Sequence, residues 1–163
     1  MAVGKARIAP FINDEFQVTG EFGTWRDTRY HVGIDLATSE PKNLYSIGDG
    51  YIFRNWWNDA RGWAVIVKMD SGIAFEYQHM QSECRLAEGS RVSNGQFIGV
   101  EGTTGQITGL HLHMEMQDLS SGRDWDYTAT LDSYMNPADY MRNSKCNRNK
   151  LDLRRYANTS NTY

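Results

Sequence analysis

The chain has 163 residues, of which 40% are hydrophobic and 23% charged, and its formal net charge is −3. A chain of this length buries one hydrophobic core, so we expect a single domain. No apolar run approaches the roughly 18 residues that a membrane-spanning helix requires. Residues 1–10 contain no apolar segment typical of a secretory signal. The composition therefore predicts a soluble protein with no membrane span and no signal peptide.

Charge is distributed unevenly along the chain. Residues 142–163 contain six lysines and arginines against one aspartate, so this end is strongly basic and the rest is acidic. We expect an N-terminal segment at 1–16, the main domain at 17–141 and a basic tail at 142–163. The tail is interpreted as a solvated end or linker, with contact to an anionic polymer as the alternative. The acidic body carries no recognised nucleic-acid-binding motif, so we expect no nucleic-acid partner.

The two cysteines indicate no metal or redox site. Cys84 and Cys146 lie far apart in the sequence and neither belongs to a CxxC motif. We therefore expect two free thiols, and a disulfide between them stays open because its geometry cannot be judged from sequence.

Short apolar runs separated by glycine turns predict an all-β fold of antiparallel sheets, as in a β-sandwich. Residues 55–63, NWWNDARGW, predict an aromatic-rich loop whose tryptophans either line a cleft or pack against the sheet. Residues 63–69 and 72–79 flank Asp70-Ser71-Gly72, whose glycine can take a positive φ, and this pattern predicts a hairpin.

A second hairpin is predicted where Val92 and residues 97–100 flank Asn94-Gly95. Residues 102–109, GTTGQITG, predict a glycine-rich loop that can bend closely around a bound group. This loop is not a phosphate loop, because no GK[ST] follows and the next segment is typical of a strand.

The end of the predicted main domain indicates a short helix. Asn136 is suited to cap its first turn, and Pro137 is suited to the first helical position. We therefore expect one helical turn at 136–141, followed by a helical or irregular tail.

The segment after the glycine-rich loop carries two histidines. Alternation along a strand places His111, His113 and Glu115 on one face. Two imidazoles on one face can both bind one metal ion, or one can bind it while the other acts on a bound water. Glu115 lies about 7 Å along the strand from His113, where it either orients a ligand or is a surface carboxylate. The pair alone also fits histidines that merely form hydrogen bonds.

Further candidate groups lie upstream. His31 and Asp35 offer nitrogen and oxygen donors that suit zinc, and Gly33 between them allows close approach. His79 ends an alternating apolar row that starts at Ile73, which places its ring at the rim of the core. Each signal alone also fits an ordinary structural residue.

Together these residues carry a family resemblance. HxGxD at 31–35, Y-x-H ending at His79, VxxGQxIG at 92–99 and GxTGxxTGxHLHxE at 102–115 occur in this order. This order resembles the LytM/lysostaphin-type zinc peptidases of family M23, which are peptidoglycan endopeptidases. The resemblance extends over about three-quarters of the chain, and all four histidines fall on motif positions.

The resemblance implies that His31, Asp35 and His113 bind one zinc ion and that His79 and His111 form the catalytic pair. Three protein ligands leave a fourth position open, as in catalytic zinc sites. One of the pair would transfer the proton of the attacking water, while the other would stabilise the oxyanion; the assignment stays open. The implied activity is hydrolysis of peptide bonds in the stem peptides or crossbridges of bacterial peptidoglycan, which would be the partner of a monomer.

One position departs from the family pattern. Some members have a tyrosine six residues before the first zinc ligand, where it assists the oxyanion, and this chain has Trp25 there. Trp25 can donate a hydrogen bond through its indole N–H or form a wall of the substrate groove, and Tyr30 is the other candidate.

Two rival interpretations remain. A LytM-like module could bind the wall or serve a phage tail without catalysis, although such a module need not keep all five polar groups. A cupin-like metal protein would share the spacing from Gly105 to the HxH pair, but its glutamate would follow His113 by four or five residues instead of two. We expect action on the cell wall, as a phage lysin, a tail-associated enzyme or a domain excised from a longer exported protein.

Overall fold

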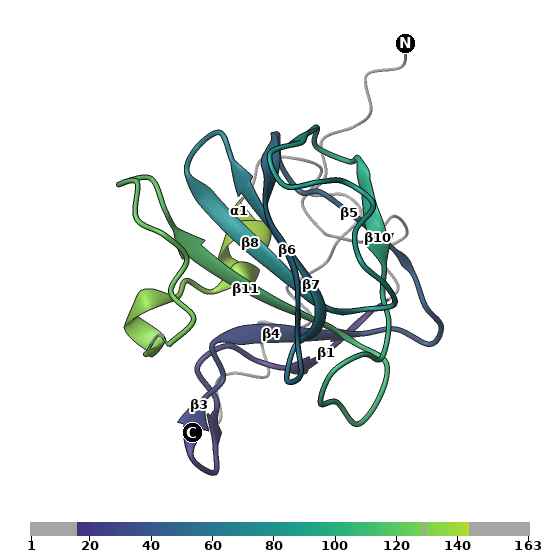
Figure 1. Ribbon diagram of the computed structural model, residues 1–163. Helices are drawn as coiled ribbons and strands as arrows, with labels where there is room; N and C mark the ends of the chain where they lie inside the picture. Colours follow the sequence, from purple (N-terminus) through teal and green to yellow (C-terminus); the bar gives the residue numbers. More distant parts are fainter. Residues whose placement is uncertain (1–15, 129, 144–163) are drawn as a thin grey trace.

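The structure is a computed structural model that describes residues 16–128 and 130–143. The predicted all-β fold is confirmed, because strands dominate the described residues (Figure 1). Most of the predicted N-terminal segment and of the basic tail lies outside the described residues, so the predicted boundaries stay predictions. Cys84 is buried, and Cys146 lies outside the described residues, so the state of the two thiols also stays a prediction.

One seven-stranded antiparallel sheet forms most of the domain (Figure 1). In spatial order its strands are β1 (Gln17–Gly20), β4 (Gly33–Ala37), β11 (Leu112–Asp118), β8 (Ile73–Met80), β7 (Gly62–Met69), β6 (Gly50–Asn58) and β9 (Arg91–Val92). Two smaller sheets pair β2 (Trp25–Arg26) with β3 (Arg29–Tyr30) and β5 (Asn43–Tyr45) with β10 (Phe97–Val100). Strands β4, β11 and β8 thus bring segments that are distant in sequence side by side.

The two faces of these central strands differ in chemistry because side chains alternate along a strand. On β11, Met114 is fully buried in the hydrophobic core, while His113 and Glu115 point to the opposite face. The register places His113 directly opposite Asp35 of β4 and Gln78 of β8. Cross-strand neighbours share a face, so the sheet itself gathers these polar groups.

The predicted hairpin formed by β7 and β8 is confirmed. The two strands pair antiparallel, and Gly72 in their turn has a φ of 90°. A side chain at this position would be strained by that φ, and its Cβ would lie 2.5 Å from the Cα of Ser120.

The predicted pairing of Val92 with residues 97–100 is wrong. Gly95 does take a φ of 81°, but β9 pairs with β6 and β10 pairs with β5. The turn forms hydrogen bonds with Ser46, which directly follows β5: Gly95 N donates to Ser46 O at 2.7 Å, and Ser46 N donates to Gln96 O at 2.9 Å. The local turn signal was correct, and these long-range hydrogen bonds select different strand partners.

Residues 55–63 are not a loop: they form the end of β6, a turn and the start of β7. The rings of Trp57 and Trp63 pack edge to face with centroids 5.4 Å apart. Trp56 contacts Tyr127 in the same manner at 4.9 Å. These tryptophans belong to strands of the sheet and contact aromatic neighbours there, and none of them lines the groove described below.

The predicted helical turn is confirmed and is longer than expected, since α1 covers Pro137–Asn143. Ala138 N donates to Asn136 Oδ1 at 2.9 Å, as expected for the cap. Met141 on α1 is buried in the core. Neither α1 nor the short 3₁₀ helix η1 (Leu131–Ser133) has the length and apolar composition to cross a bilayer.

Candidate active site

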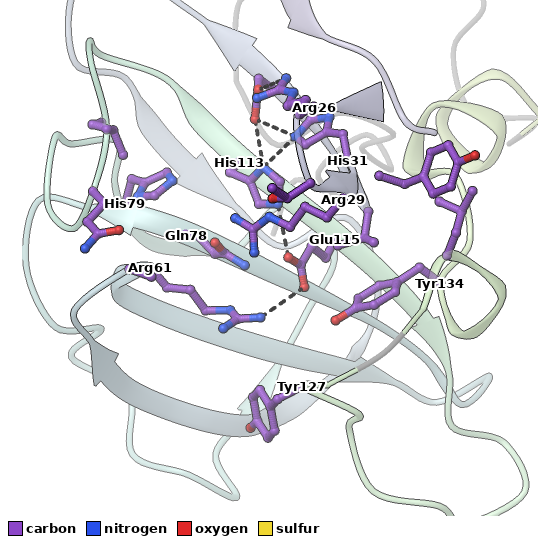
Figure 2. A pocket seen from close by; sticks show the side chains of 18 of the residues that line it. Arg26, Arg29, His31, Arg61, Gln78, His79, His113, Glu115, Tyr127 and Tyr134 are labelled. Atoms are coloured by element: carbon purple, nitrogen blue, oxygen red, sulfur yellow. Dashed lines mark hydrogen bonds and ion pairs between the residues drawn. The ribbon is translucent and has the colours of Figure 1, made fainter. Parts of the chain in front are cut away.

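The three predicted metal ligands converge where β4 and β11 meet, and Figure 2 shows two of them, His31 and His113, side by side. His31 precedes β4, Asp35 lies within it, and His113 is its direct partner on β11. His113 Nδ1 lies 2.7 Å from Asp35 Oδ1. His31 Nε2 lies 3.2 Å from the same oxygen and 3.1 Å from His113 Nδ1. Two nitrogens and one oxygen therefore face a common point.

Hydrogen bonds behind each ring determine which nitrogen faces this point. His31 Nδ1 donates to the carbonyl oxygen of Glu21 at 2.8 Å, and His113 Nε2 donates to Glu115 Oε1 at 3.1 Å. The remaining nitrogens are those that meet Asp35. A carbonyl or carboxylate acceptor behind a ligating imidazole is typical of metal sites. Glu115 is only 3% exposed, so of its two interpretations the surface carboxylate is wrong.

Asp35 uses its second oxygen to bind an arginine. Arg26 Nη2 donates to Asp35 Oδ2 at 2.8 Å. Gly20 makes room for this pair, since a Cβ there would lie 2.2 Å from both atoms. Burial alone would raise the pKa of Asp35, but hydrogen bonds from His113 and His31 outweigh burial and hold this pKa far below its ordinary value. Asp35 is therefore a carboxylate throughout the physiological range.

His79 reaches the site through a β-bulge. Simple alternation would place it on the core face with Phe75 and Tyr77, as the sequence predicted, and this is wrong. The φ of His79 is 63°, and the register between β7 and β8 shifts at this end. Gln78 and His79 consequently both line the site. Bulges occur beside active sites because they redirect a side chain, and a left-handed φ at a non-glycine residue is uncommon.

His79 and His111 each bind a backbone carbonyl through one nitrogen. His79 Nδ1 donates to Thr104 O at 2.9 Å, and His111 Nδ1 donates to Gly109 O at 3.0 Å. This leaves Nε2 of each ring available to the site; His111 Nε2 lies 3.6 Å from Asp35 Oδ1. The two rings meet edge to face at 5.0 Å. Burial lowers the pKa of His79 to about 4, so this ring is neutral at physiological pH.

All five predicted polar residues line one groove with a volume of about 1250 Å³. Trp25 and Tyr30 of the β2–β3 hairpin also line it; they are 59% and 49% exposed, and their rings lie 5.0 Å apart. From the 55–63 segment, the groove receives Ala60 and Arg61 instead of a tryptophan. A role for Trp25 or Tyr30 at an oxyanion stays a prediction.

Sequence reasoning missed several groove residues, and one of their neighbours left a readable signal. Arg26, Arg61 and Tyr134 line the groove without belonging to any motif identified in the sequence. Glu76 is completely buried and interrupts the apolar run IAFEY on β8. A charged residue within such a run is rarely buried without a partner, and this could have directed attention to Arg61.

Residues 29–126 match the model of peptidase family M23. This match covers more than half of the chain and includes the groove histidines. The chain belongs to peptidase family M23. The resemblance inferred from the motifs is thereby confirmed.

Relatives of this M23 chain are similar over about half of its length or more. The peptidoglycan DD-endopeptidase ShyA of Vibrio cholerae serotype O1 is 34% identical over 86 residues, which are 53% of this chain and 20% of that protein. A zinc-containing peptidase from Vibrio cholerae superposes with a TM-score of 0.61 at 27% identity, covering 69% of this chain and 36% of that one. The catalytic domain of lysostaphin from Staphylococcus simulans gives 0.65 at 20% identity, covering 78% and 92%. The chain spans about one fifth of the length of the curated relatives it matches.

The residues of this M23 site fit a catalytic zinc ion. Zinc binds imidazole nitrogen and carboxylate oxygen, and the three candidate ligand atoms lie within 4.8 Å of one another. The hydrogen bonds behind both rings direct the correct nitrogens inward. Three protein ligands leave a coordination position free, as catalytic zinc requires.

Proposed function

We propose that this M23 domain is a zinc-dependent endopeptidase that hydrolyses peptide bonds in bacterial peptidoglycan, in stem peptides or crossbridges. One observation carries the proposal: the ligand atoms of His31, Asp35 and His113 converge beside His79 and His111 in one groove. The choice of substrate is supported by relatives named as peptidoglycan DD-endopeptidases and as a glycyl-glycine endopeptidase.

Each residue has a defined task in the proposed reaction. His31, Asp35 and His113 hold the zinc ion, which supplies a Lewis acid and acidifies water when it is bound. His79 is neutral and accepts the proton of the attacking water at Nε2, then delivers it to the leaving amine. The Nε2 of His111 faces the same place and, with a second ring proton taken from solvent before the reaction, would donate a hydrogen bond to the developing oxyanion. The carbonyl oxygens of Thr104 and Gly109 keep both rings oriented during these transfers.

The groove provides a place for an extended peptide across these groups. The exposed rings of Trp25 and Tyr30 offer apolar contact area beside the ligand set. We propose the bacterial cell wall as the place of action, which the activities named for relatives support. Origin as a phage lysin, a tail-associated enzyme or a domain of a longer exported protein stays a prediction.

The test is digestion of purified peptidoglycans that differ in their crosslinks, one direct and one with a glycine bridge. New amino groups and the masses of released fragments are measured with zinc and with a chelator. We expect about one zinc per chain, zinc-dependent release of amines, and a fragment mass that identifies the bond. Tight binding to the wall with no new amines from any peptidoglycan would instead favour the non-catalytic module.

A further inference from the structure

Arg61 lies in the turn between β6 and β7 and extends its guanidinium into the groove (Figure 2). Its Nε lies 3.3 Å from Glu76 Oε2, and its Nη2 lies 3.9 Å from Glu115 Oε2. Glu115 in turn accepts a hydrogen bond from His113. Figure 2 shows this series of contacts from Arg61 through Glu115 to His113. The guanidinium is therefore two contacts away from the proposed metal ligand.

The two carboxylates beside Arg61 are buried where isolated charges are unfavourable. Glu76 is 0% and Glu115 3% exposed, and neighbouring carboxylates in such a place repel each other unless a cation lies between them or one of them holds a proton. Arg61 is also the cation that stacks over Trp56, with its Cζ 5.7 Å from the ring centroid, and over Tyr127, at 5.8 Å. Two rings and two carboxylates thus restrict the position of one guanidinium.

Glu76 and Glu115 have different surroundings, which indicate different roles. Glu76 accepts hydrogen bonds from Trp56 Nε1 at 3.1 Å and from Gln78 Nε2 at 2.8 Å. Glu115 Oε2 has no hydrogen-bond partner among the described residues, and its ion pair there is with Arg61. His113 holds Oε1 of Glu115, and the rest of this carboxylate lies beside Arg61 and the carboxyl group of Glu76, so Arg61 is the cation placed to orient it.

The main chain of Arg61 makes a second connection to the site. Its carbonyl oxygen accepts a hydrogen bond from His79 N at 2.9 Å. This bond lies at the bulge that brings His79 into the groove. One residue is consequently attached to a metal ligand through its side chain and to the catalytic pair through its backbone.

We propose that Arg61 is a positioning residue. Its side chain orients Glu115, which in turn orients the His113 ring with Nδ1 toward the metal site. Its carbonyl oxygen holds the backbone at the His79 bulge. The consequence for hydrolysis rests on the proposed function. The consequence for metal binding requires only that the three ligands bind zinc.

The test uses three variants of the full chain. Arg61→Lys keeps the charge but removes the planar guanidinium. The double variant Arg61→Met with Glu76→Gln removes the cation together with the carboxyl group that contacts its Nε, so Glu76 is not left buried without the cation beside it. Arg91→Met is the matched control, because Arg91 forms a bidentate ion pair with Asp70 at 2.6 and 2.9 Å on the exposed surface.

Zinc affinity is measured by competition with a chelator in the absence of substrate. Loss of support behind a metal-bound histidine typically weakens metal binding about 10–100-fold, so we expect this loss in the double variant and a smaller one in Arg61→Lys. Nitrogen NMR of the zinc-loaded proteins should show that the His113 Nε2 proton exchanges faster than in the wild type. Arg91→Met should match the wild type in both measurements, and thermal unfolding of the metal-free proteins reports whether each variant folds.

Wild-type zinc affinity and an unchanged His113 signal in the folded Arg61 variants would overturn the proposal. If the double variant does not fold, the affinity of Arg61→Lys decides. Failure of the proposed function has a different signature, since a wild-type chain that binds zinc but releases no amines leaves the Arg61 measurements fully interpretable. A wild-type chain that binds no zinc would overturn both.

Discussion

The direction of each histidine ring in the groove is determined by an acceptor that is not itself reactive. Backbone carbonyls hold His31, His79 and His111, and a carboxylate holds His113. The difference is chemical, because a carboxylate behind an imidazole increases its basicity as a ligand more than a carbonyl does. At the scale of single residues, we therefore expect removal of His113 to affect metal binding and removal of His79 to affect proton transfer.

Paired alanine substitutions separate metal binding from proton transfer. His113→Ala removes a ligand, so we expect loss of stoichiometric zinc and of peptidoglycan hydrolysis together. His79→Ala should keep about one zinc per chain while hydrolysis falls about 10²–10⁴-fold, the usual contribution of general acid–base catalysis. Metal analysis and amine release on the same samples check both results. Zinc retained by His113→Ala, or lost from His79→Ala, would contradict the assignment.

Gly20 tests the role of the arginine on Asp35. In Gly20→Ala the new Cβ would lie 2.2 Å from Arg26 Nη2 and Asp35 Oδ2, so we expect their ion pair to be displaced and zinc binding to weaken about 10-fold. Arg26→Ala should have a similar effect on affinity. Gly89→Ala is the control, because its φ of 85° makes it strained but nothing lies within 4 Å; it should lose stability without losing zinc affinity. Equal zinc affinities in all three would show that Arg26 does not support Asp35.

At the scale of elements, sequence alternation predicted the faces of β11 and the hairpin of β7 with β8, because period-2 patterning is a local property. It failed for His79 because this residue lies at a bulge, where one strand has an extra residue relative to its partner. The presence of a bulge depends on the pairing strand and cannot be read from the local alternation. His111 was likewise assigned to the strand, whereas β11 begins at Leu112. The Arg61 side chain was missed because its partners, Glu76 and Glu115, come from two other strands.

Alanine substitutions at two glycines with the same φ test whether the 102–109 loop must keep its position against His79. Gly105 and Gly122 both have a φ of 82°, so alanine causes similar backbone strain at each. At Gly105 the Cβ would also lie 2.4 Å from Gly62 N, which would push the 102–109 loop and the Thr104 carbonyl away from His79. We expect Gly105→Ala to reduce hydrolysis at least about 10-fold and to lower the free energy of unfolding about 1–3 kcal/mol more than Gly122→Ala. Equal activities would show that loop placement is not critical.

At the scale of the whole molecule, both faces of one sheet contribute to stability, and one of them also carries the site. Its core face carries residues such as Tyr77 and Met114, which are fully buried. The opposite face carries buried ionisable groups, including Glu76 and Glu115, whose proton binding differs between the folded and unfolded chain. The stability of the domain must therefore vary with pH through groups that also support the site.

Glu76 contributes to whether the free energy of unfolding rises or falls with pH, in a range that can be measured on the metal-free protein. Burial, aided by the charge of Glu115, raises the pKa of Glu76 from 4.5 to about 8. Between these values the folded chain retains a proton that the unfolded chain releases, so this group makes the free energy of unfolding fall as pH rises, by at most about 1.4 kcal/mol per pH unit. Below pH 4.5 both states hold the proton and the contribution of Glu76 is constant.

Urea unfolding of the wild type and of Glu76→Gln between about pH 5 and 6.5 measures this contribution. Groups distant from Glu76 titrate alike in both proteins, so the difference between the two slopes reports Glu76 together with Glu115, whose proton binding depends on Glu76. We expect the free energy of unfolding of Glu76→Gln, relative to the wild type, to increase with pH, because glutamine releases no proton. Glu83→Gln, on the exposed surface, is the control and should follow the wild-type slope. Parallel curves for the wild type and Glu76→Gln would mean that Arg61, the Trp56 indole N–H and the Gln78 amide keep Glu76 ionised in the folded chain despite its burial.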